Sequence, residues 1–143
     1  MNKKIVEMLT RLAIDNPGVR KQFKFGAGIV YKNHLIATGI NSHKTHPLMA
    51  QWGQNDESIC LHAEIDAIKN ALKLITPSQL AKCDMYIVRV KRPEPESNEW
   101  VHGLAKPCKG CRRAIANFEI KNVFYTNDYE SCSNESMKDI YAQ

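Results

Sequence analysis

Two short motifs, far apart in the chain, constrain its fold most strongly. His62-Ala63-Glu64 stands at the expected start of one helix, and Pro107-Cys108-Lys109-Gly110-Cys111 at the expected start of another. One imidazole and two thiolates can fill three of the four tetrahedral positions around Zn²⁺, which leaves the fourth position open for water. A fold that uses these ligands together has to bring the two helix starts into contact.

The spacing inside each motif suits metal binding. Cys108 and Cys111 are three residues apart, which places both sulfurs on one face of a first helical turn, and Pro107 favours a helix start. The positive end of a helix also stabilises thiolates. His62 and Glu64 are two residues apart and would diverge within a helix, so both can face one cavity only from a first turn.

A C-x-x-C pair has other uses, chiefly thioredoxin-type redox pairs and four-cysteine structural zinc sites. The chain has no second C-x-x-C, and no strand sets Cys108 in a thioredoxin-like unit near the N-terminus. Its five cysteines are an odd number in a chain without a recognisable export signal, which argues against a disulfide framework. A catalytic zinc site is therefore the favoured interpretation.

A His-x-Glu motif followed by Pro-Cys-x-x-Cys is the signature of zinc nucleobase deaminases. The chain resembles the cytidine deaminase superfamily over nearly the whole of its single-domain core. Three further stretches are similar to that family, namely its first strands at 25–30, its glycine-x-asparagine step at 38–41 and its zinc helix at 61–68. Because the first ligand is histidine, the resemblance is closer to the deoxycytidylate and tRNA adenosine deaminase branches than to the all-cysteine branch.

The resemblance implies that Zn²⁺ is the cofactor, with His62, Cys108 and Cys111 as its ligands. Glu64 would be the catalytic residue. Its carboxylate would take a proton from water and return protons to the ring nitrogen and to the departing ammonia. Without the neighbouring zinc ligands, a glutamate in a first helical turn would be read as a residue stabilised by the helix dipole.

The resemblance also suggests four substrate-binding residues. Asn41 is similar to the asparagine that binds the sugar, although a turn asparagine is the plain alternative, and the backbone N–H of Ala63 would orient the base. In the long loop 42–59, His43 can receive a phosphate and Trp52 can pack on a base or ribose, or both can be surface residues.

A second, structural zinc ion occurs in some deoxycytidylate deaminases near this loop. Here only His43, His46 and Cys60 could take part in such a site, and their pattern is not a clean match. Whether a second zinc exists therefore stays open from the sequence.

The hydrophobic pattern predicts an α/β fold, a three-layer α/β/α sandwich with a mixed five-stranded sheet and both zinc helices on one face. One domain over residues 1–143 is expected from the length. The predicted helices are 2–14, 60–74, 107–117 and 134–141, and the predicted strands are 23–31, 34–40, 85–90 and 122–125.

The leading prediction for function is hydrolytic deamination of a cytosine nucleotide or nucleoside, with deoxycytidylate preferred. One alternative is a deaminase acting on tRNA or single-stranded DNA, which the net charge of +5 favours, and another is a non-catalytic zinc-stabilised binding module. We expect a small-molecule nucleotide partner, no membrane partner, a homo-oligomer and a cytoplasmic location, since no apolar run approaches the length of a membrane helix.

Overall fold

The computed structural model describes residues 2–17, 24–42, 62–94, 96–128 and 137–139. Its helices are α1 (Lys3–Ile14), α3 (Ala63–Leu72), α4 (Pro77–Leu80) and α5 (Lys109–Asn117). Its strands are β1 (Lys24–Tyr31), β2 (His34–Ile40), β3 (Asp84–Lys91), β4 (Val101–Gly103), β5 (Asn122–Thr126) and β6 (Met137–Asp139). In the described parts of the chain, no helix combines the length and the apolar character that crossing a bilayer would require.

The strands form one mixed sheet in the order β2-β1-β3-β5-β6, and the short β4 pairs with β3 beside this path. The β3–β5 pair is parallel, and the other pairs are antiparallel. The strand, helix, strand alternation of the second half therefore gives a parallel pair, as the sequence predicts.

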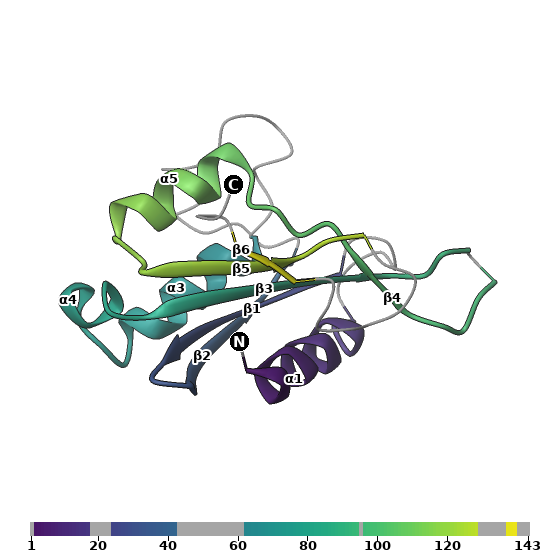
Figure 1. Ribbon diagram of the computed structural model, residues 1–143, viewed down its shortest axis with the longest axis horizontal. Helices are drawn as coiled ribbons and strands as arrows, with labels where there is room; N and C mark the ends of the chain where they lie inside the picture. Colours follow the sequence, from purple (N-terminus) through teal and green to yellow (C-terminus); the bar gives the residue numbers. More distant parts are fainter. Residues whose placement is uncertain (1, 18–23, 43–61, 95, 129–136, 140–143) are drawn as a thin grey trace.

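Two apolar cores lie on opposite faces of the sheet. On one face, residues of α3 and α5 such as Ile65 and Ile115 pack with Ile87 of β3. On the other face, α1 packs through Leu9 against alternate residues of β3 such as Val88. Figure 1 shows α1 and α5 on either side of the sheet. The three-layer sandwich with both motif-bearing helices on one face is thus confirmed.

Local sequence signals account for the first elements. The side chain of Asn2 accepts hydrogen bonds from the backbone N–H groups of Lys4 and Ile5, which caps the start of α1. The β1–β2 hairpin turns through Lys32 and Asn33, whose φ angles of 47° and 66° are those of a two-residue turn matched to the twist of the strands. Both elements lie where the sequence predicts them.

The packing of β2 against α3 depends on Gly39, which has no side chain to separate strand from helix. A Cβ atom at this position would lie 2.5 Å from the carbonyl oxygen of Ala63 and 2.8 Å from the carbonyl carbon of Asp66. These are backbone atoms, which cannot swing aside. Gly39 therefore sets how closely the first turn of α3 approaches the sheet.

Side chains of α3 also hydrogen-bond to the backbone of β2. The carboxylate of Asp66 accepts from the N–H of Ile40 at 3.0 Å, and the amide of Asn70 donates to the carbonyl oxygen of Thr38 at 2.8 Å. Asp66 also pairs with Lys69 at 2.8 Å. The start of α3 and the end of β2 are thus joined by polar contacts as well as by close packing.

We expect Gly39→Ala to destabilise the protein by about 3 kcal/mol, the upper end of the usual cost of overpacking, because the added methyl group meets helix backbone. Gly28→Ala is the matched control, since its added Cβ would meet the tip of Leu35 at 2.6 Å and the methyl groups of Leu9 at 3.2 Å, which can rotate. Urea unfolding measures both free energies, and equal losses in the two variants would contradict the role given to Gly39.

Several predicted boundaries are wrong. The predicted C-terminal helix 134–141 is contradicted at Met137–Asp139, which form β6 against β5. The segment between β3 and α5, expected to be all loop, contains β4, because its backbone pairs with the end of β3. The short helix α4 was not predicted, and it begins at a capping box formed by Thr76 and Gln79.

Candidate metal centre

His62 stands directly before α3 as its N-cap residue, in an extended conformation. The helix therefore begins at Ala63, later than the predicted start at residue 60. Glu64 occupies the second position of the helix and is 6% exposed. The prediction that both His62 and Glu64 belong to the very start of the helix is confirmed.

Cys108 is the N-cap residue of α5, and its sulfur accepts a hydrogen bond from the backbone N–H of Cys111 at 3.4 Å. The helix itself begins at Lys109. The prediction that Pro107 is the first helical residue is wrong, because the sulfur of Cys108 takes the capping role that defines the helix start. Cys111 is buried in the first turn, while Cys108 is exposed.

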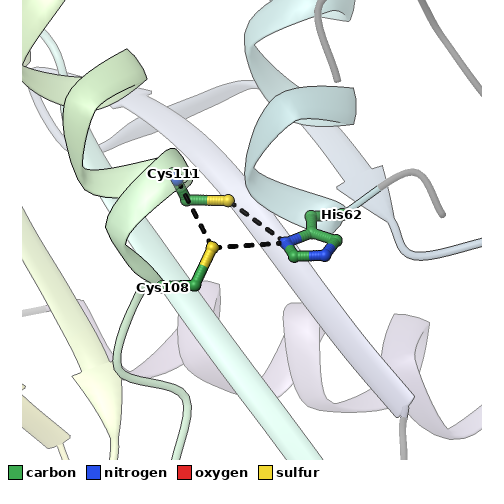
Figure 2. A group of neighbouring side chains, drawn as sticks. All are labelled: His62, Cys108 and Cys111. Atoms are coloured by element: carbon green, nitrogen blue, oxygen red, sulfur yellow. Dashed lines mark hydrogen bonds between the residues drawn. The ribbon is translucent and has the colours of Figure 1, made fainter. Parts of the chain in front are cut away.

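The three candidate ligands meet although they come from two helices. Nδ1 of His62 lies 3.3 Å from Sγ of Cys111 and 3.7 Å from Sγ of Cys108. Figure 2 shows the three side chains pointing toward one another from the starts of α3 and α5. Their donor atoms all lie within 4.8 Å of one another, and among the described residues this is the group of His, Cys, Asp and Glu side chains suited to hold a metal ion.

These distances fit zinc. Bond lengths of about 2.0 Å to nitrogen and 2.3 Å to sulfur give a nitrogen-to-sulfur edge of about 3.5 Å in a tetrahedron. The observed separations of 3.3 and 3.7 Å lie on either side of that value. A set of one imidazole and two sulfurs is also the donor chemistry that zinc prefers. The three residues therefore form a possible zinc site.

The two sulfurs differ in charge. The hydrogen bond from the Cys111 thiol lowers the pKa of Cys108 to about 3, with a further contribution from His62. The same hydrogen bond, together with burial, raises the pKa of Cys111. The pair thus carries one thiolate and one thiol. Because zinc binds thiolates, filling this site would release the remaining proton.

Glu64 lies beside the cluster. Burial raises the pKa of its carboxyl group, while the charge of His62 acts in the opposite direction. The nearby Cys111 side chain also acts to lower this pKa. A carboxyl group that is buried next to a metal site and holds a proton easily has the properties required of a general acid and base.

Asn41 lies at the end of β2, where its side chain is held in place. Its Oδ1 accepts from the Asn16 amide at 3.1 Å and from the backbone N–H of Phe25 at 3.0 Å. The Asn16 amide also donates to the backbone carbonyl of Asn41 at 2.9 Å. This network, which the sequence did not reveal, fixes the direction of the Asn41 amide group.

The remaining predicted site residues divide into two groups. Ala63 is the first residue of α3 and is buried, directly beside His62. His43 and Trp52, together with the second-zinc candidates His46 and Cys60, lie outside the described residues. The substrate-binding roles of all four predicted residues, Asn41 included, stay predictions.

The fold and the site together define a class of protein, the zinc-binding deaminase domain, in which a histidine and a cysteine pair at two helix starts share one face of a mixed sheet. The chain belongs to the family of the cytidine and deoxycytidylate deaminase zinc-binding region, whose model matches residues 2–127. The resemblance predicted from the sequence is thereby confirmed. Among curated proteins, no relative matches the sequence.

Solved structures confirm the fold. The dCMP deaminase of cyanophage S-TIM5 in apo form is 21% identical, with a TM-score of 0.54, over 91% of this chain and 88% of that one. The same enzyme in complex with dCMP and dUMP is 20% identical, with a TM-score of 0.55, over 90% and 85%. The cytidine deaminase of Burkholderia pseudomallei is 16% identical, with a TM-score of 0.60, over 97% and 91%.

Proposed function

We propose that this protein is a zinc-dependent hydrolase that deaminates a cytosine nucleotide or nucleoside, with deoxycytidylate preferred, to the uracil product and ammonia. One observation carries the proposal: the buried carboxyl of Glu64 lies next to the cluster of His62, Cys108 and Cys111. A scaffold that used zinc for stability alone would gain nothing from a buried carboxyl at that position.

In this proposal His62, Cys108 and Cys111 hold the metal. When bound, zinc supplies Lewis acidity that makes a water molecule easier to deprotonate. Two thiolates offset the charge of the cation, so a nearby base is needed to complete the deprotonation. Glu64 would take this proton and pass it to the ring nitrogen of the base. It would then take a second proton, from the hydroxyl group that has added to the ring carbon, and pass it to the departing amine, which leaves as ammonia.

Substrate recognition is assigned to the four predicted residues. Asn41 would bind the sugar as a donor through its amide NH₂, because its oxygen already accepts from Asn16 and Phe25. The backbone N–H of Ala63 would orient the base. His43 would bind the phosphate and Trp52 would pack on the base or ribose, as the sequence suggests.

Two findings favour a nucleoside monophosphate over other substrates. The family includes deoxycytidylate deaminases, and the phage enzyme of similar fold has been solved with dCMP and dUMP. The net charge of +5 also suits an anionic substrate. The same charge supports the second candidate function, deamination of a base in tRNA or single-stranded DNA.

The test is ammonia release by the zinc-loaded protein from separate pools of cytidine, deoxycytidine, their monophosphates, adenosine, guanine and a single-stranded oligonucleotide. We expect turnover of the monophosphates, with deoxycytidylate fastest. Turnover confined to the oligonucleotide would replace the proposal with the second candidate, and turnover of none would contradict the proposed activity on a free nucleotide or nucleoside. Light scattering tests the expected homo-oligomer, which a monomer would contradict.

A further inference from the structure

The strand β3 changes neighbours along one of its edges. Residues 84–87 pair with β5 in parallel, whereas residues 89–91 pair with β4 in antiparallel fashion. Because β1 pairs with β3 along residues 84–90, both β4 and β5 have to lie along the opposite edge. Along this edge of β3 the partner therefore changes from β5 to β4 at the point where the last residue of β5, Thr126, and the last residue of β4, Gly103, come together.

Thr126 bridges this interruption with its side chain. Its hydroxyl donates to the carbonyl oxygen of Gly103 at 2.7 Å and accepts from the N–H of Arg89 at 3.0 Å. Its backbone carbonyl accepts from the N–H of Ala105 at 2.9 Å. One fully buried residue of β5 thus holds the end of β3, the end of β4 and the segment that follows β4.

The segment after β4 leads to the metal centre. Ala105 and Pro107 are buried, while the alternate residues Leu104, Lys106 and Cys108 are exposed, as in an extended strand that lies against the core. Cys108 comes three positions after Ala105, which limits the distance between their Cα atoms to about 10 Å. The hydrogen bond from Ala105 to Thr126 thus holds the backbone only a short distance before the start of α5.

We propose that Thr126 is a positioning residue for the metal centre: its hydroxyl and carbonyl hold the 103–107 segment so that Cys108 meets His62 and Cys111 at zinc-binding distance. This inference rests on the zinc site proposed above. It assigns no contact between Thr126 and the metal. Thr126 acts through the backbone that carries Cys108.

The hydroxyl of Thr126 makes both of its side-chain hydrogen bonds, so a side chain of the same shape without a hydroxyl cannot replace it. Valine has the same shape, but it would leave the N–H of Arg89 and the carbonyl of Gly103 facing a methyl group in a site without solvent exposure. Such groups recover partners only if β4 and the following segment move. Serine keeps the hydroxyl and so keeps both hydrogen bonds.

Zinc affinity of the full-length protein, measured by competition with a chromogenic chelator, tests the proposal. We expect Thr126→Val to bind zinc about tenfold more weakly, the low end of the effect of residues that orient metal ligands indirectly. The cobalt-loaded variant should also show a shifted thiolate-to-cobalt absorption. Thr126→Ser should restore the wild-type affinity and spectrum.

Val123→Ala is the matched control for stability, because Val123 is a fully buried residue of the same strand without polar side-chain contacts. It should lower the thermal midpoint but leave zinc affinity unchanged. Wild-type zinc affinity and cobalt absorption in Thr126→Val would overturn the proposal, and so would an equal loss of affinity in Val123→Ala or in Thr126→Ser.

Hydrogen exchange of the wild-type protein without zinc keeps the test decisive if Thr126→Val does not fold. The amide protons of Arg89 and Ala105 should exchange as slowly as those of residues 85–87 of β3, and rapid exchange would overturn the anchoring role of Thr126. Failure of the proposed zinc site gives a different result, since the wild-type protein itself would then bind no zinc, and the positioning role would fall with it.

Discussion

Replacement of Glu64 by glutamine is expected to lower turnover by about 10⁴-fold while the zinc content stays at that of the wild type. The loss should reach the upper end of the usual range for general acid and base catalysis, because one carboxylate both accepts and returns protons in the proposed reaction. Zinc content should not change, because the proposed ligands are His62, Cys108 and Cys111, and Glu64 is not one of them.

Glutamine is the right replacement because the fold should tolerate it. Burial raises the pKa of Glu64, which favours the neutral carboxyl, and a neutral amide of the same shape should cost little stability at this position. Steady-state kinetics with deoxycytidylate and metal analysis of the same preparation separate loss of chemistry from loss of metal.

Asp66→Asn is the matched control for this experiment. Asp66 is a second buried carboxylate on α3, and its carboxylate oxygens contact Ile40 and Lys69. Its contact with His62 is made by the backbone N–H, which the substitution keeps. An asparagine oxygen can still accept from the N–H of Ile40, so this variant should keep most of its activity. Full activity in Glu64→Gln, or equal losses in both variants, would contradict the catalytic role of Glu64.

Replacement of Cys108 by serine is expected to remove both zinc and turnover. Complete zinc sites bind with about 10–16 kcal/mol, so one ligand accounts for about 3–4 kcal/mol, or roughly 10²–10³-fold in affinity. A serine hydroxyl cannot replace a sulfur whose pKa is lowered to about 3 and which is therefore a thiolate at neutral pH.

Cys83→Ser provides the control for the loss of a cysteine as such. The Cys83 thiol is buried before β3 and donates to the carbonyl oxygen of Gln79, a bond that a serine hydroxyl can keep. Equilibrium dialysis should find one zinc per chain in Cys83→Ser and none in Cys108→Ser at the same concentration. Stoichiometric zinc in Cys108→Ser would remove Cys108 from the site.

Local signals explain why much of the fold and the ligand set could be predicted. The three-residue spacing of Cys108 and Cys111 fixes their relation within one helical turn, whatever the rest of the chain does. The Lys32-Asn33 turn is likewise specified by its two flanking apolar runs. The parallel β3–β5 pair follows from the helix between the two strands.

The two missed strands have a common physical cause, because each forms only by pairing with another strand. Val101–Gly103 is too short to show a strand period, and it becomes a strand only by pairing with β3. Met137–Asp139 pairs with β5, which overrides a weak helical pattern. The hydrogen bonds of Thr126 and Asn41 also join separate elements, so no pattern in the sequence could reveal them.

The hydrogen bonds from α3 to β2 also affect whether two molecules of this protein can pair through the edges of their sheets. In the part of the chain that the structure describes, β2 is an edge strand of the sheet. An edge strand has backbone N–H and C=O groups that can pair with a strand of another molecule. Asp66 and Asn70 occupy the N–H of Ile40 and the carbonyl of Thr38, two groups that an incoming strand would use. The helix that carries Glu64 thus also protects this edge strand from edge-to-edge aggregation.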